Sequence, residues 1–272
     1  MKLIVLFLSL LFASHVFAQT YEDFIGDSYD FLEKNDLPAA EEALRAAMRL
    51  EPANPFNYAL LTNLGTIQRR QGKKEDALLS YTTALSRRPD DILLLANRAS
   101  LYGETGDAEK AIADYNTILS IDNVNQDALY YRGLLYIQLR NLVEAEADFD
   151  RMLQINEKTL NGRVGHAILA KVRGNYDESE RIYNYLISEM PQVWTLYEGR
   201  AELYFMMEKN ARAIDDLNKV LSATTPAASF YILRAKIKIA QYERQAARED
   251  LQKAAEMGYP SEIIAELRKL CD

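Results

Sequence analysis

Paired arginines and aspartates at a fixed spacing are the residues of this chain whose types and positions suit specific chemistry. In four places an arginine precedes an aspartate by the same interval, i to i+16. The pairs are Arg98 with Asp114, Arg132 with Asp148, Arg200 with Asp216, and Arg234 with Asp250. A guanidinium can hold a carboxylate through two parallel N–H···O bonds, so we interpret the pairs as structural ion pairs that fix helix stacking. The alternative is a row of arginines that captures acidic ligands.

Other chemical groups are scarce. His166 and Ile182 stand where the series of pairs would continue, and His166 is the only histidine besides His15. A zinc site of His and Cys ligands therefore lacks residues, and a histidine-dependent triad would rest on one side chain. Phosphate-binding glycine loops and Gly-x-Ser-x-Gly sequences are absent. We predict no catalytic site, no metal and no cofactor, and we interpret His166 as a neutral packing substitute for arginine.

The pairs recur because the whole sequence repeats. The repeats begin at Tyr21, Tyr58, Ile92, Gln126, Leu160, Trp194 and Ala228, evenly spaced except for a slightly longer first interval. A fixed period of roughly 34 residues is typical of helical solenoids. Position 20 of each repeat holds a small residue, which allows two helices to cross closely. These residues are Ala40, Ala77, Ala111, Ala145, Ser179, Ala213 and Ala247.

Further positions complete a pattern that resembles the tetratricopeptide repeat family. Position 24 holds leucine or an aromatic residue, and glycine at position 15 separates two helical stretches in three repeats, at Gly72, Gly106 and Gly174. The resemblance implies an all-α fold, an α-α superhelix (solenoid) of about seven helix pairs with a concave groove. The expected repeats are 21–54, 58–91, 92–125, 126–159, 160–193, 194–227 and 228–261, followed by an amphipathic capping helix at 262–271.

The resemblance also implies that ligands contact the first helix of each pair. The predicted groove residues are Tyr130, Tyr131, Leu134, Ile137, Val164, Ile168, Glu198, Glu202 and Phe205. An apolar patch beside acidic residues favours contact with a protein or peptide. The alternative is that Tyr130, Leu134 and Ile168 pack against neighbouring helices. The lysine- and asparagine-rich clamp of the chaperone-binding members is not reproduced here.

The N-terminus predicts export. Residues 1–18 combine Lys2, an apolar run and the sequence Val16-Phe17-Ala18, which is typical of a secretory signal cleaved after Ala18. We expect residues 19–272 to form one domain in the periplasm or cell envelope. Cys271 is the only cysteine, so no internal disulfide can form. The net charge of −8 argues against nucleic acid and anionic membrane surfaces as partners.

These observations predict a non-catalytic adaptor or scaffold, not an enzyme, that binds a peptide or helix of an envelope protein in its groove. One alternative is a self-associating structural component of an envelope assembly, and a homo-oligomer is left open. Another is a glycan-binding protein or a hydrolase that uses carboxylates such as Glu198 and Glu202. We expect no stable membrane insertion after signal cleavage.

Overall fold

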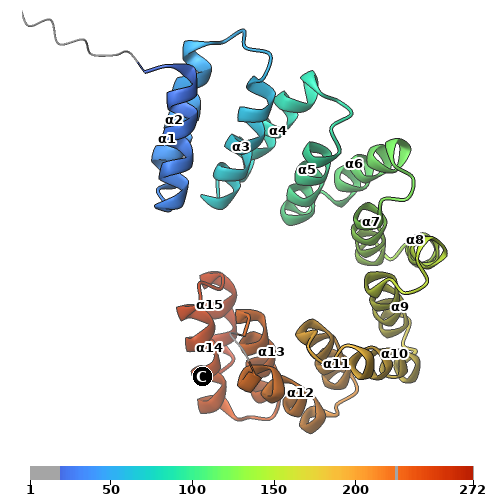
Figure 1. The fold of residues 1–272 in the computed structure, drawn as a ribbon. Coiled ribbons are helices and arrows are strands. Elements are labelled where there is room, and N and C mark those ends of the chain that lie inside the picture. Colours follow the sequence, from blue (N-terminus) through green and yellow to red (C-terminus); the bar gives the residue numbers. More distant parts are fainter. Residues whose placement is uncertain (1–18, 224–225, 272) are drawn as a thin grey trace, which may run out of the picture. The chain divides into compact units, whose positions relative to one another are not determined.

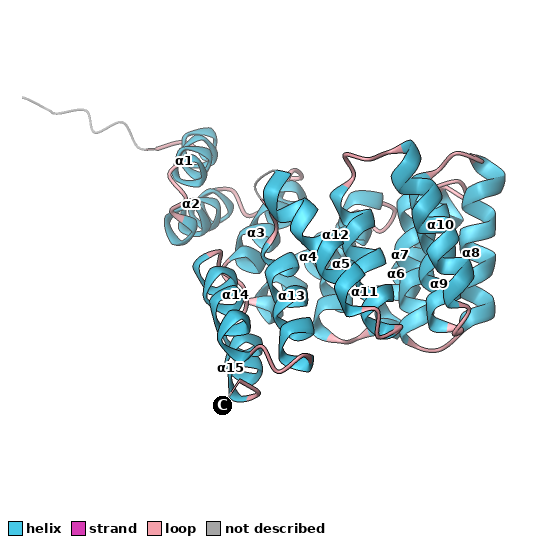
Figure 2. Ribbon diagram, turned by 90° about the horizontal axis from the view of Figure 1, so that it is seen from below, coloured by secondary structure: helices cyan, strands magenta, loops and turns pink. Residues whose placement is uncertain are grey.

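The computed structural model describes residues 19–223 and 226–271. Within these ranges the chain forms fifteen helices and no strand (Figures 1 and 2). Residues 1–18, which carry the predicted export signal, lie outside the described residues, so the signal and its cleavage stay predictions. None of the described helices combines the length and the apolar character that a bilayer crossing requires.

The helices belong to two compact units, which divide the described residues between 107 and 108. The first unit contains α1 (Tyr21–Glu33), α2 (Leu37–Leu50), α3 (Asn57–Arg70), α4 (Lys74–Arg87) and α5 (Ile92–Thr105). The second contains α6 (Ala108–Ile121), α7 (Gln126–Gln138), α8 (Leu142–Ile155), α9 (Leu160–Val172), α10 (Tyr176–Glu189), α11 (Trp194–Met206), α12 (Asn210–Ala223), α13 (Ala228–Ala240), α14 (Arg244–Glu256) and α15 (Ser261–Lys269).

Within each unit, a helix packs chiefly against the helices before and after it in the sequence. This is the arrangement of a solenoid, in which each repeat contacts its neighbours. The predicted all-α architecture of helix pairs is therefore confirmed. The division between the units falls between α5 and α6, inside the third predicted repeat. The single domain expected for residues 19–272 stays a prediction.

Each helix pair turns at position 15 of its repeat, where the backbone is left-handed. Glycine occupies this position in three repeats, with φ angles of 78° to 86°. The other four repeats adopt the same conformation without glycine, at Asn35 (56°), Arg140 (64°), Glu208 (58°) and Tyr242 (62°). Residues with a Cβ atom are strained in this region. The packing of the two helices therefore imposes the turn, and glycine only relieves its strain.

The core between paired helices is built on the small residues at position 20. Ala145 and Ala213 are fully buried, and so is Ser179, whose hydroxyl donates to the carbonyl oxygen of Ala167 at 2.8 Å. That bond explains how a polar residue replaces alanine here, since a buried hydroxyl needs a partner.

Phe149 of α8 packs against residues of two neighbouring first helices, α7 and α9. A Cβ atom added to Gly133 would lie 2.6 Å from its ring, and Gly165 approaches the same ring as closely from α9. The Phe149 ring lies 6.3 Å from the ring of Tyr130 and 6.0 Å from that of His166. The two glycines thus let one aromatic side chain pack against both α7 and α9.

Helix α15 covers the end of the second unit, as predicted for a capping helix. Its Ile264 is buried against α14 together with Cys271, and Leu267 packs beside them. Arg268 donates to the side-chain oxygen of Gln252 at 2.8 Å. Burial of this apolar face keeps the last helix pair from being exposed.

Candidate functional site

Three of the predicted ion pairs lie within the second unit, and all three form. Each arginine of a first helix donates through Nε and Nη2 to both carboxylate oxygens of its predicted aspartate on the second helix. In the Arg200–Asp216 pair both distances are 2.7 Å. Burial opposes the charge of Arg200, but the hydrogen bond to Asp216 and the charges around the guanidinium together outweigh it and raise the pKa of Arg200. The aspartates are buried, which agrees with a structural role for the pairs; that role stays an interpretation.

The third donor of each guanidinium reaches back to the preceding repeat. Arg132, Arg200 and Arg234 donate through Nη1 to the side-chain oxygens of Asn116, Asn184 and Asn218, each at 2.6 Å. Every arginine therefore joins three helices: the second helix of one repeat and both helices of the next. We call one such arginine with its two acceptors a ladder step. These asparagines were not predicted from the sequence, although all of them hold position 25 of their repeats.

The fourth pair is divided between the units. Arg98 lies in the first unit and Asp114 in the second, so their pairing stays a prediction. Within the first unit, Arg98 donates to the hydroxyl of Thr82 at 3.2 Å. Thr82 holds position 25 of its repeat, so this backward contact follows the pattern of the asparagines.

One ladder step of the second unit is interrupted at His166. Ile182 replaces the aspartate, and a carboxylate, Asp150, replaces the asparagine of the preceding repeat. His166 Nε2 lies 3.1 Å from Asp150 Oδ1, but this buried nitrogen has no aligned hydrogen-bond partner among the described residues. His166 also packs its ring against that of Phe149, so its interpretation as a packing substitute for arginine stays a prediction.

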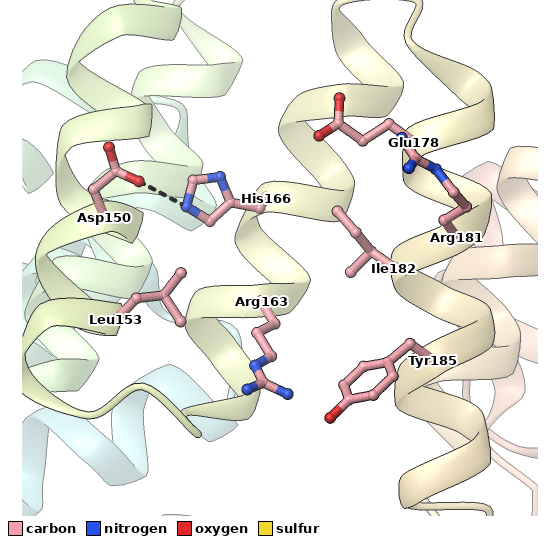
Figure 3. Close-up of a pocket in the computed structure, with 8 residues that line it drawn as sticks. All are labelled: Asp150, Leu153, Arg163, His166, Glu178, Arg181, Ile182 and Tyr185. Atoms are coloured by element: carbon pink, nitrogen blue, oxygen red, sulfur yellow. Dashed lines mark ion pairs between the residues drawn. The ribbon is translucent and has the colours of Figure 1, made fainter.

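A cavity of about 580 Å³ opens at the interrupted step. Figure 3 shows its lining side chains, which come from three consecutive helices. Asp150 and Leu153 project from α8, Arg163 and His166 from α9, and Glu178, Arg181, Ile182 and Tyr185 from α10. We call this cavity the interrupted-step pocket.

A second cavity, of about 410 Å³, gathers five of the nine predicted groove residues. They come from three first helices, α7, α9 and α11, and are Tyr130, Val164, Ile168, Glu198 and Glu202. Asn161, Lys171 and Thr195 line it as well. Its residues on α9 lie on a different face from Arg163 and His166. We call this cavity the groove pocket.

The remaining predicted groove residues lie outside this cavity. Leu134 and Ile137 are half-buried against the cluster around Phe149, and Phe205 packs against the core of α11, α12 and α13. The packing alternative therefore describes Leu134, and in part Tyr130, which also contacts the Phe149 cluster. Tyr131 is half exposed, with its ring stacked 6.2 Å from that of Tyr115.

The groove pocket is apolar at its walls and acidic at one side. Lys171 Nζ lies 2.8 Å from Glu202 and so offsets one of the two carboxylates. Burial raises the pKa of Glu198, and the charge of Glu202 adds to this shift, while a hydrogen bond from Ser229 opposes it. Burial also raises the pKa of Tyr130. Glu198 is thus the acid of this pocket with least compensation from a cation.

In the residues that the structure describes, no three His, Cys, Asp or Glu side chains come together in a cluster suited to a metal ion. Both pockets present apolar surface, hydrogen-bonding groups and charged side chains.

Comparisons with known proteins agree with this architecture. A family model described as tetratricopeptide repeat matches residues 28–92 and 96–158. The crystal structure of a tetratricopeptide repeat protein from Parabacteroides merdae is similar over 93% of this chain and 99% of that one, with 62% sequence identity and a TM-score of 0.82. No match was found among functionally curated proteins.

Two more distant structures are similar in fold alone. Yeast Tom70 is 16% identical, with a TM-score of 0.71 over 97% of this chain and 58% of that one. PilW, described as a widely conserved type IV pilus biogenesis factor, is 22% identical, with a TM-score of 0.56 over 77% of this chain and 98% of that one.

Proposed function

The chain belongs to the tetratricopeptide repeat family, and from this premise we propose that it is an adaptor that binds a peptide or helix of a partner protein in the groove pocket. The fold supports a role in protein–protein interaction in general, and proteins of this family generally act as non-catalytic scaffolds. The observation that carries the finer proposal is the convergence of Tyr130, Val164 and Ile168 with two carboxylates in one cavity.

The pocket has the size and character of a recognition site. Its volume of about 410 Å³ falls within the range of about 300–1,000 Å³ that ligand pockets occupy. Tyr130 and Ile168 supply apolar surface, whose burial by a partner drives binding. Glu198 and Glu202 at one side would favour a partner segment that carries a positive charge near its apolar anchor. This combination supports a peptide ligand better than a free anion.

We place this activity in the cell envelope as part of the proposal. Its support is the pattern of residues 1–18, with Lys2, the apolar run and Ala18 before the expected cleavage point. Fractionation of the producing cells, with mass spectrometry of the N-terminus, tests this placement. A mature N-terminus at Gln19 in the periplasmic or envelope fraction agrees with export, whereas an intact Met1 in the cytoplasm would contradict it.

Affinity capture with crosslinking from an envelope extract tests the binding function. The tagged mature chain is compared with a Tyr130→Ala/Ile168→Ala variant and with a Val143→Ala/Tyr242→Ala control. Val143 and Tyr242 are exposed residues outside the groove pocket, so the control removes similar side chains elsewhere. A partner lost only from the groove variant supports the proposal. Glu202→Arg, at an exposed rim position, provides a second groove variant that leaves the core untouched.

Other outcomes would replace the proposal. Capture of the same proteins by all variants would move the binding site to another face. Capture of the chain itself alone would favour self-association. Binding or turnover of a glycan that depends on Glu198 and Glu202 would favour the carboxylate alternative.

A further inference from the structure

The interrupted-step pocket exists because one ladder step lacks the atoms that fill its neighbours. In the intact steps, the guanidinium of Arg132, Arg200 or Arg234 occupies the space between two second helices. His166 is shorter than arginine, and the side chain of Ile182 cannot accept a hydrogen bond. A cavity of about 580 Å³ remains at this step. The cavity is independent of the groove pocket and shares no residue with it.

An intact step pairs one arginine with one aspartate, whereas the interrupted step carries one carboxylate and no arginine. In the neighbouring repeats, position 25 holds a neutral residue. These residues are Thr82, Asn116, Asn184, Asn218 and Gln252. Only at the interrupted step is it a carboxylate, Asp150, and here the arginine that would face it is missing. The side chain of Asp150 is 55% exposed and therefore open to a ligand from solvent. The interrupted step therefore has its carboxylate at position 25 instead of position 23 and lacks the permanent cation that offsets it in the intact steps.

The cations that remain in the lining do not take the place of that arginine. The guanidinium of Arg163 lies over the ring of Tyr185, 5.3 Å from its centre, and donates to the carbonyl oxygen of Glu157 at 3.1 Å. In Figure 3 this pair lies at the opposite end of the pocket from Asp150 and His166. Arg181, the other cation, is an exposed residue three positions after Glu178 on α10, across the pocket from Asp150 in Figure 3.

The pocket therefore changes along its length from charged to apolar. Asp150 and Glu178 supply carboxylates on either side of His166, whereas Leu153 and Ile182 supply aliphatic surface below them (Figure 3). An arginine or lysine side chain has the matching pattern, because its methylene stem is apolar and only its head is charged.

We propose that the interrupted-step pocket binds an arginine or lysine side chain presented by a partner protein. The stem packs between Leu153 and Ile182, and the charged head pairs with Asp150 and Glu178. The partner's side chain thereby occupies the position that an arginine of the chain itself occupies in each intact step. Binding at this pocket adds a second contact surface, formed by α8, α9 and α10, to the chain.

The test uses the methyl NMR signals of Leu153 and Ile182 in the full mature chain. The probes are N-acetyl-arginine amide and N-acetyl-lysine amide, with N-acetyl-glutamate amide and N-acetyl-leucine amide for comparison. We expect both basic probes to shift these signals saturably, while the methyl signals of Leu217, beside the intact Arg200 step, stay in place. Asp150→Asn should weaken binding of the arginine probe by about tenfold, because a charge-assisted hydrogen bond is lost.

Two further variants fill the pocket in different ways. The triple variant Asp150→Asn/His166→Arg/Ile182→Asp restores the residues of an intact step and should abolish the response of Leu153 to the arginine probe. Ile182→Phe fills the cavity without adding charge, should also abolish the response, and serves if the triple variant does not fold. Stronger binding of the glutamate or leucine probe, unchanged binding by Asp150→Asn, or no saturable shift with either basic probe would overturn the proposal.

Discussion

Two steps of the same ladder show how a repeat protein can use equivalent positions for different purposes. At Arg200 the guanidinium is held by Asn184 and Asp216, and the space between the helices is filled. At His166, the equivalent position of the preceding repeat, the contacts are reduced to one approach to Asp150, and a cavity opens. The backbone repeats in both places, so the difference comes from three side chains.

The intact steps stabilise the solenoid, whereas the interrupted step leaves a surface that a ligand can reach. An intact step satisfies donors and acceptors of three helices at once, which stabilises both the pair and its stacking on the preceding pair. The interrupted step gives up those bonds and gains an accessible cavity. A break in a regular pattern of buried side chains is therefore a place to look for recognition.

The first prediction tests the stability of an intact step and should have the largest effect. Asp148→Ala leaves the guanidinium of Arg132 without its carboxylate, and the free energy of unfolding should fall by about 3 kcal/mol. Denaturant titration followed by circular dichroism measures this change.

The matched control lies on the same helix at the interrupted step. Asp150→Ala removes a carboxylate that is 55% exposed, whereas the side chain of Asp148 is 5% exposed. Its effect should stay below about 1 kcal/mol. Equal losses from the two variants would contradict the distinction between intact and interrupted steps.

The second prediction extends the comparison to the first unit, where one acid joins two repeats. Glu41 accepts from Lys73 at 2.9 Å and from Gln68 at 3.2 Å, both in the next repeat, and from Arg45 at 2.8 Å in its own helix. Burial alone would raise the pKa of Glu41, but these donors lower it to about 2.

A lowered pKa makes this contact sensitive to acid. The stabilisation is fully present above the ordinary pKa of about 4.5 and is lost as the pH falls towards 2. We expect Glu41 to contribute up to ~2 kcal/mol at neutral pH. Comparison of wild type with Glu41→Gln between pH 6 and pH 2, roughly the window of this titration, should show their stabilities converging in acid. A constant difference across this range would exclude the titration of Glu41 as the cause.

The third prediction concerns the left-handed turn at position 15, which forms both with and without glycine. Arg140 and Gly174 hold position 15 of consecutive repeats and have φ angles of 64° and 81°. Arg140→Gly should stabilise the second unit by about 1 kcal/mol, because the strain of a Cβ atom is removed. Gly174→Arg should destabilise it by a similar amount. Thermal unfolding of both variants measures the pair, and changes of the same sign would contradict the argument from strain.

Much of the architecture could be predicted from the sequence because equivalent positions of the repeats can be compared with one another. Position 20 identified residues that are fully buried, and Arg132, Arg200 and Arg234 could be matched with their aspartates through a constant spacing. The C-terminal cap followed from an amphipathic pattern. These features depend on local periodicity, which is visible in one sequence.

Features that depend on packing between repeats were harder to predict. Position 25 changes from threonine to asparagine, aspartate and glutamine, so its shared role as an acceptor is hidden by its varied chemistry. Leu134 and Phe205 were predicted to face the groove, but their half-buried packing depends on the angle at which helices cross. The interrupted-step pocket arises because the side chain of His166 is shorter than the arginine of an intact step, and no sequence motif describes such a difference.

The most direct test of this account is a double-mutant cycle of His166→Arg and Ile182→Asp in an Asp150→Asn background. Ile182→Asp alone should destabilise the protein, because it places a carboxylate in a half-buried site without a partner. Adding His166→Arg should recover the loss, with a favourable coupling of about 2 kcal/mol between the two positions. Effects that simply add would contradict the claim that these positions act as one ladder step and that their replacement opened the pocket.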